Sequence, residues 1–151
     1  MTILEDHPTR ISGALETLVR DVLSDQGYPD RVEVTVHTVG SDIITRRNSE
    51  AFGKEQPTDV VSFPLENLKP GVAPEVDPLG PPVVLGDVFI APEIVVERAG
   101  QHGFDPDAEM ALMAVHGVLH LMGYDHIDDA GAEEMEAIET RVLANHGFRR
   151  R

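Results

Sequence analysis

The segment His116-Gly-Val-Leu-His120-Leu-Met-Gly-Tyr-Asp-His126 holds three histidines in a short, largely apolar stretch. His116 and His120 stand four residues apart in a run expected to be helical, so their side chains leave the same helix face, one turn apart. Gly123 offers an end for this helix, and the turn that follows can bring His126 back toward that face. The pattern predicts three imidazoles around a metal ion, with a fourth position open for water, as in catalytic zinc sites.

Incidental histidines are the alternative to a metal site, because a single histidine on an apolar helix face is usually a packed or solvent-touching residue. The third histidine, the terminating glycine and the apolar flanks from Met110 to Met122 favour the metal site. Zinc is the predicted ion because imidazole suits it, although nickel, iron or another divalent ion could use the same ligands. We therefore expect His116, His120 and His126 to be the metal ligands and to act in catalysis through the metal and its water.

The same spacing occurs in zinc peptidases of the H-E-x-x-H-x-x-G-x-x-H class, with Gly123 in the matching glycine position. Those peptidases need a glutamate directly after the first histidine, as the general base for the water on zinc. Gly117 stands at that position here. The sequence thus keeps the ligands of a peptidase and lacks its base, which indicates a hydrolase with a different arrangement.

Hydrophobic periodicity along the chain predicts a mixed α/β fold, with helices packed on a small sheet. The expected order is a helix from Thr9 or Ser12 to about Gln26, a strand at 31–39, a short helix from Ser41 to about Phe52, strands at 60–63 and 83–91, and helices at 92–102, 105–122 and 128–145. The helix opened by Asp105 and Pro106 is apolar on nearly all faces, so we expect it to be the buried central helix. Residues 65–82 are rich in Pro and Gly and are expected to form a long surface loop.

The length of 151 residues fits one domain, 1–151, with a single sizeable core. The chain has no cysteine, so disulfides are excluded and every metal ligand must be His, Asp, Glu or water. No apolar stretch approaches membrane-spanning length. A cytoplasmic protein with no membrane partner is expected, and the sequence leaves the oligomeric state open.

The formal net charge of −15, with only two lysines, Lys54 and Lys69, is unusual for a protein that binds nucleic acid. Such binding draws most of its affinity from Lys and Arg at phosphates, so an RNA substrate would require a local basic groove. Two alternatives to an RNA substrate stay open. One is an acidic surface without a partner, and the second is adaptation to high salt, which screens the self-repulsion of the charges.

Three blocks of the sequence resemble the YbeY family of metal-dependent endoribonucleases. They are the histidine string at 116–126, the block Pro57-Thr-Asp-Val-Val-Ser-Phe-Pro64 and the block Leu85-Gly-Asp-Val-Phe-Ile90. The resemblance implies a small mixed, mostly parallel sheet of about four strands packed with about five helices, with the metal helix laid against it. It also implies a single-strand-specific endoribonuclease of ribosomal RNA processing (16S rRNA 3′-end maturation) and ribosome quality control, whose partner is the small ribosomal subunit.

The chain departs from this family at one position. Many members carry an arginine six residues before the Thr of the T-D-V block, where it is thought to help position RNA phosphate, and this chain has Phe52 there. An aromatic ring cannot supply a bidentate phosphate clamp, and the alternative for Phe52 is a core position in its helix. The expected substrate-binding residues are therefore Arg46, Arg47, Lys54 and Ser62.

Several further carboxylates and arginines leave two alternatives each. Asp125 either accepts the second N–H of a ligating histidine or only forms the turn. Asp87 interrupts an apolar strand and has either a structural or a catalytic role. The basic C-terminus, Arg149 to Arg151, is expected to be a frayed tail, with RNA contact as the alternative.

Two other classes of function stay open from the sequence. One is a metal-dependent hydrolase of another kind, including a peptidase whose base comes from elsewhere in the chain. The second is a non-catalytic ribosome-associated factor in which the metal serves the fold. A carboxylate near the open metal position would favour the first, and RNA cleavage that survives metal removal would favour the second.

Overall fold

The computed structural model describes residues 1–53 and 58–151. Within them the chain forms, in order, β1 (Thr2–Glu5), α1 (Ser12–Asp25), β2 (Val32–Thr38), α2 (Ser41–Phe52), β3 (Val60–Pro64), β4 (Val83–Ile90), α3 (Pro92–His102), α4 (Pro106–Leu121) and α5 (Asp129–Asn145). The mixed fold with about five helices is confirmed. No helix in the described part of the chain is long and apolar enough to cross a membrane.

The strands form one sheet in the order β1-β2-β4-β3. β1, β2 and β4 run parallel, and β3 pairs antiparallel with β4 at one edge. The mostly parallel four-stranded sheet is thus confirmed. The sequence patterns had not indicated β1, because its four residues bury only part of one apolar side chain, Ile3. Pairing with β2, from Thr2 opposite Thr35 to Glu5 opposite Thr38, makes this segment a strand.

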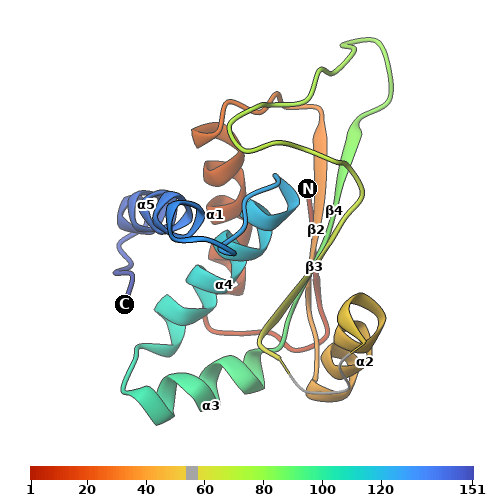
Figure 1. Cartoon of the computed structure of the whole chain (residues 1–151). Helices are drawn as coiled ribbons and strands as arrows, with labels where there is room; N and C mark the ends of the chain where they lie inside the picture. Colours follow the sequence, from red (N-terminus) through yellow and green to blue (C-terminus); the bar gives the residue numbers. More distant parts are fainter. Residues whose placement is uncertain (54–57) are drawn as a thin grey trace.

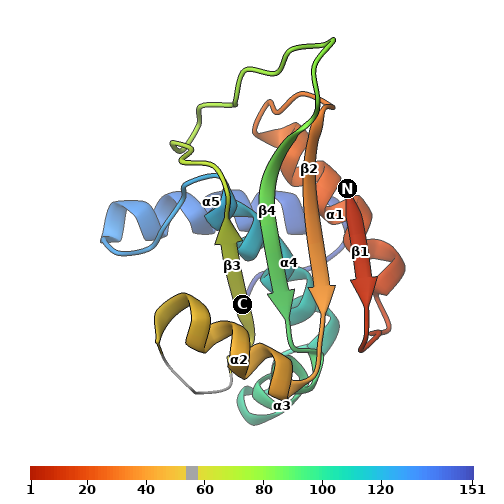
Figure 2. The same ribbon diagram turned by 90° about the vertical axis from the view of Figure 1, so that its right-hand side faces the viewer.

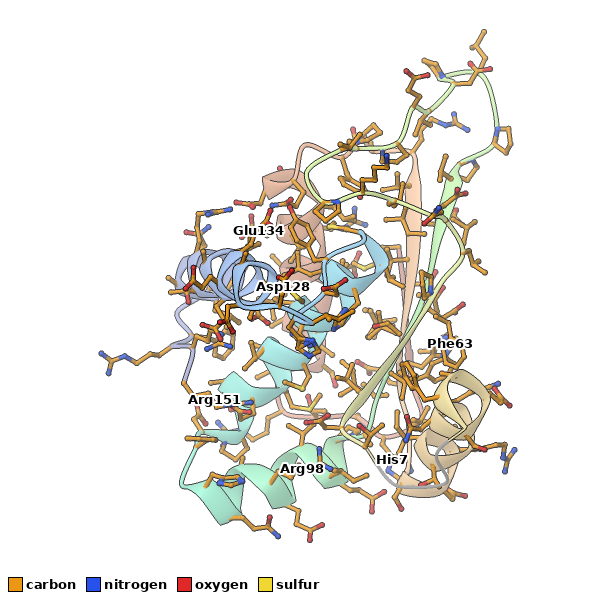
Figure 3. All side chains as sticks on the ribbon, viewed as in Figure 1. His7, Phe63, Arg98, Asp128, Glu134 and Arg151 are labelled. Atoms are coloured by element: carbon orange, nitrogen blue, oxygen red, sulfur yellow. The ribbon has the colours of Figure 1, made fainter. Side chains whose placement is uncertain are left out.

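Helices cover the two faces of the sheet unequally. α1, α4 and α5 lie on one face, and α2 lies alone on the other, near one end of the strands (Figures 1 and 2). The main core fills the first side, while a smaller cluster under α2 holds Val39, Ile44, Val61, Phe89, Ala91 and Ile94. Figure 3 shows Phe63 on the α2 side, where it packs at the edge of this smaller cluster. The asymmetry leaves the β3 edge between the two groups of helices.

Helix α4 is the central element of the fold. Asp105 caps its first turn by accepting from the Asp107 amide at 3.3 Å, and Pro106 fits the first helical position. From Ala108 to Leu121 every residue of the helix is buried except His116 and His120. The two histidines are therefore the places where this buried segment reaches toward solvent.

Two connections fix the surroundings of the site. Residues 65–82 run from β3 to β4 without helix or strand, as expected from their Pro and Gly content (Figure 1). Gly86 in β4 has a φ of +141°, and a Cβ there would collide with the carbonyl oxygen of Phe63. Only glycine therefore allows β3 to approach β4 this closely.

Replacing Gly86 with Ala should destabilise the protein by at least about 2 kcal/mol, because the substitution adds a strained φ and a backbone collision. Gly100→Ala is the matched control. Gly100 lies inside α3 with open space around its Cβ position, so that change should add up to about 1 kcal/mol through helix propensity. Denaturant unfolding measures both, and equal stability of the two variants would contradict the packing at Gly86.

Candidate metal centre

The structure brings His116, His120 and His126 together. The first two project from adjacent turns of α4, and the Nε2 atoms of their rings lie 2.9 Å apart. His126 comes from the turn between α4 and α5, and its ring centroid lies 5.3 Å from that of His116 and 5.2 Å from that of His120. One nitrogen of each ring falls within 4.8 Å of the others. Three imidazoles at these separations can bind one metal ion.

Hydrogen bonds at the far side of two rings fix which nitrogen faces the centre. Nδ1 of His116 lies 2.9 Å from Oε2 of Glu139, and Nδ1 of His120 lies 2.9 Å from the Tyr124 carbonyl oxygen. Both partners are acceptors, so each Nδ1 carries the proton and donates it, which leaves the Nε2 lone pairs facing each other. Two lone pairs at 2.9 Å repel unless a cation lies between them. The donor set therefore fits a divalent metal.

Burial supports the neutral, metal-binding form of His120. Desolvation by the surrounding core, together with the nearby His116, lowers the pKa of His120 to about 4. The Tyr124 carbonyl opposes this effect and does not cancel it. His120 is therefore an uncharged imidazole near neutral pH, the form that binds metals.

The turn that returns His126 depends on backbone geometry. Gly123 has a φ of +94°, and a Cβ there would collide with the carbonyl of Leu68. Oδ1 of Asp125 accepts from the Ile127 amide at 3.2 Å, so Asp125 forms the turn, the second of its two predicted roles. The Tyr124 hydroxyl hydrogen-bonds to the side chain of Gln26 and ties the turn to the end of α1.

Glu139 is the carboxylate that sequence reasoning missed. It lies on α5 with only 1% of its surface exposed, and its second oxygen, Oε1, accepts from Nε of Arg150 at 3.3 Å. A signal was present in the sequence, because Glu139 falls inside the apolar stripe of α5. The buried members of that stripe are Met135, Ile138, Val142 and Leu143. A carboxylate at such a position is costly unless it is paired, which makes it a candidate for a functional contact.

The C-terminal arginines are docked, which corrects the expectation of a frayed tail. Besides Glu139, Arg150 approaches Glu136 at 3.6 Å. Arg151 pairs with the mostly buried Glu109 at 3.0 Å and lies over the ring of Phe104. The end of the chain therefore packs beside α4 and α5.

The three histidines open onto a cleft of about 850 Å³ at the β3 edge. Its walls come from the end of α2, from β3 and the residues around it, and from the α4–α5 turn, and Figure 2 shows all of these at the same edge of the sheet. The lining residues include Ala51, Phe52, Thr58, Asp59, Val60, Ser62, Leu65, Asp125 and Ile127. This volume is in the range of small-ligand sites, about 300–1,000 Å³.

Gly117, at the position of the peptidase base, has no room for a side chain. A Cβ there would lie 2.5 Å from Cγ1 of Val88 and 3.3 Å from both Oγ of Ser62 and Cγ2 of Val60. Ser62 also donates its hydroxyl to the Gly117 carbonyl at 2.9 Å. Ser62 lies in the cleft as predicted, and it also holds β3 against α4.

The predicted basic residues are not gathered in the cleft. Arg46 is exposed on α2 and does not line the cleft. Arg47 pairs with Glu50 at 2.9 Å and lies over the ring of Phe89, and Lys54 lies outside the described residues. Arg98 of α3, which sequence reasoning did not consider, pairs with the cleft residue Asp59 at 3.2 Å.

Two further residues differ from one of their expected roles. Phe52 is 64% exposed and lines the cleft, so the alternative of a core position is wrong. Asp87 pairs with His37 at 2.9 Å, and the ring of His37 stacks on Phe89. Asp87 is not among the cleft residues, and this contact gives it a structural role.

Comparison with known proteins gives a consistent result. The family model for Endoribonuclease YbeY matches residues 4–147. An Endoribonuclease YbeY of Chromohalobacter salexigens is 42% identical over 131 residues, covering 87% of this chain and 79% of its own. One of Moorella thermoacetica is 37% identical over 147 residues, covering 96% and 94%. A solution structure of a Thermotoga maritima protein superposes with a TM-score of 0.64 at 24% identity, over 97% of this chain and 90% of that one.

Replacing any one of His116, His120 or His126 with Ala should sharply reduce the bound metal per chain, because each ring supplies one of three protein ligands. Elemental analysis after gel filtration measures this. The control is His102→Ala, which removes an exposed histidine of α3 and should leave the metal content unchanged. Full occupancy in all three ligand variants would rule out the site.

Replacing Glu139 with Gln should weaken metal binding by about 10- to 100-fold, the usual effect of removing a carboxylate behind a ligating histidine. A competition titration against a chromogenic chelator measures the affinity. Glu133→Gln, an exposed carboxylate on the same helix, should bind metal like the parent. Equal affinities for the Glu139 variant and the parent would mean that this contact does not orient His116.

Proposed function

The chain belongs to the YbeY family of endoribonucleases, and from this premise we propose that it hydrolyses single-stranded ribosomal RNA at a zinc ion held by His116, His120 and His126. The observation that carries the proposal is the convergence of three histidines at an open cleft, with two of their rings fixed from behind. The proposed reaction adds water across one P–O bond of the phosphodiester. It leaves a phosphate monoester on one product and a hydroxyl on the other.

Each side chain has a defined task in this proposal. His116 and His120 present Nε2, because Glu139 and the Tyr124 carbonyl hold the Nδ1 protons. A zinc ion at such ligands supplies a Lewis acid that lowers the pKa of a water and stabilises negative charge on a phosphoryl group. Ser62 has its hydroxyl committed to Gly117 and positions the β3 wall of the cleft.

The shape of the site argues against the two other classes of function. A peptidase of the same ligand spacing needs its glutamate at the position of Gly117, where the sheet leaves no space. A structural zinc site is closed by four protein ligands. Here the three histidines line an open cleft, and His126 is exposed.

We propose that the substrate strand follows the cleft around β3 and that the biological substrate is 16S ribosomal RNA near its 3′ end. Family membership and the width of the cleft support this substrate. The role also includes ribosome quality control, and it makes the small ribosomal subunit the partner and the cytoplasm the place of action. Arg46, Arg47, Lys54 and Arg98 are the proposed phosphate contacts outside the cleft.

Zinc-loaded protein should cleave a single-stranded fragment from the 3′ end of 16S ribosomal RNA and should leave the same fragment intact when it is paired with its complement. Cleavage should stop on addition of a chelator and should fall at least about 100-fold in His120→Ala, because metal-assisted catalysis contributes several kcal/mol. His102→Ala should cleave like the parent. Metal-dependent cleavage of an unstructured peptide, lost in His120→Ala, would instead favour the peptidase class.

A further inference from the structure

Three large apolar side chains are exposed around the same cleft. Phe52 at the end of α2 is 64% exposed, Leu65 just after β3 is 65% exposed, and Ile127 in the α4–α5 turn is 88% exposed. All three line the cleft that holds the histidines. Single exposed apolar residues are common on proteins and need no special cause. Three such residues from three separate segments around one cleft form an apolar rim, which is the usual sign of a binding surface.

The charges of the cleft indicate which part of an RNA strand this rim meets. Among the described residues that line the cleft, none is Lys or Arg, and two, Asp59 and Asp125, are carboxylates. The guanidinium of Arg98 is already paired with Asp59. Phosphate oxygens would therefore be poorly held at the rim. The flat apolar face of an unpaired nucleobase fits it better, because bases of single-stranded RNA commonly stack on aromatic side chains.

We propose that Phe52 is the stacking platform for one unpaired nucleobase beside the cleaved phosphate, and that Ile127 and Leu65 complete an apolar subsite for this base. The inference rests on the proposed ribonuclease function and specifies how that site recognises its substrate. The subsite selects single-stranded RNA, because a paired base is stacked within its duplex and cannot offer a free face. It also supplies affinity that does not depend on positive charge, in a chain whose net charge is −15.

Substitutions at Phe52 test the subsite through kcat/KM on a short single-stranded ribosomal RNA, with zinc-loaded protein. Phe52→Ala should lower kcat/KM by about 5- to 100-fold, the usual effect of losing one stacked base. Phe52→Trp should stay near the parent because it keeps an aromatic face. The factor lost in Phe52→Ala should be the same at every salt concentration, since stacking releases no counterions. Leu79→Ala, which removes an exposed leucine away from the cleft, is the control.

A single abasic nucleotide placed in turn at each position of the RNA identifies the partner of Phe52. At one position near the cleaved bond, the abasic RNA should slow the parent by about the factor lost in Phe52→Ala. The Phe52→Ala variant should lose little more there, because the two changes remove the same contact.

The outcomes separate this inference from the proposed function. An RNA that the parent cleaves and that Phe52→Ala cleaves equally well overturns the stacking subsite and leaves the ribonuclease function standing. A loss in Phe52→Ala that no abasic position reproduces also overturns it, and would indicate a protein partner at the rim. A parent protein that loads zinc and cleaves no RNA overturns the proposed function and this inference together.

Discussion

The close contact between α4 and the sheet at Gly117 sets the position of everything else in the site. Without a side chain at this residue, the helix lies against Val60, Ser62 and Val88, and the Ser62 hydroxyl bonds to the helix backbone. The rest of the helix is enclosed by α1, α3 and α5, so it has little freedom to rotate or slide. His116 and His120 then emerge at a fixed place, beside the edge strand β3.

Burial of the helix has an electrostatic consequence that the fold resolves locally. Imidazoles at the margin of an apolar core need partners for their N–H groups. His120 finds one within its own turn, the Tyr124 carbonyl, whereas His116 depends on Glu139 from another helix. Glu139 is itself almost fully buried and is partnered by Arg150 from the end of the chain. Metal binding and the docking of the C-terminus are therefore linked through one carboxylate.

The acidic character of the chain shapes how such a site can handle a polyanion. Many carboxylates are distributed over the surface, and several arginines are engaged in ion pairs, as in Arg141 with Asp25 and Arg20 with Glu16. Arg141 holds the pKa of Asp25 below its usual value, so this pair stays charged near neutral pH. Few cations therefore remain to attract RNA from a distance. Recognition at short range, by metal and by apolar contact, is the physical alternative that the cleft offers.

Local sequence patterns determined the elements with strong periodicity and the ligands that lie close together in the chain. The spacing from His116 to His126, the glycine at 123 and the apolar run before them were enough to predict three converging imidazoles, because a helix turn and a tight turn are short-range geometry. The central helix, the long loop and the strands other than β1 followed from composition and alternation in the same way. β1 could not be predicted, since its four residues become a strand only by pairing with β2.

The tertiary structure alone decided which distant residues complete the site. Glu139 lies 23 residues from His116 in the chain, and the packing of α5 on α4 brings them into contact. The same holds for Arg150 behind Glu139 and for Phe52, which reaches the cleft because β3 carries the chain from the α2 side of the sheet to its edge. Short-range spacing thus fixed the metal ligands. Their second hydrogen bonds and the walls of the cleft required long-range packing, which no local pattern records.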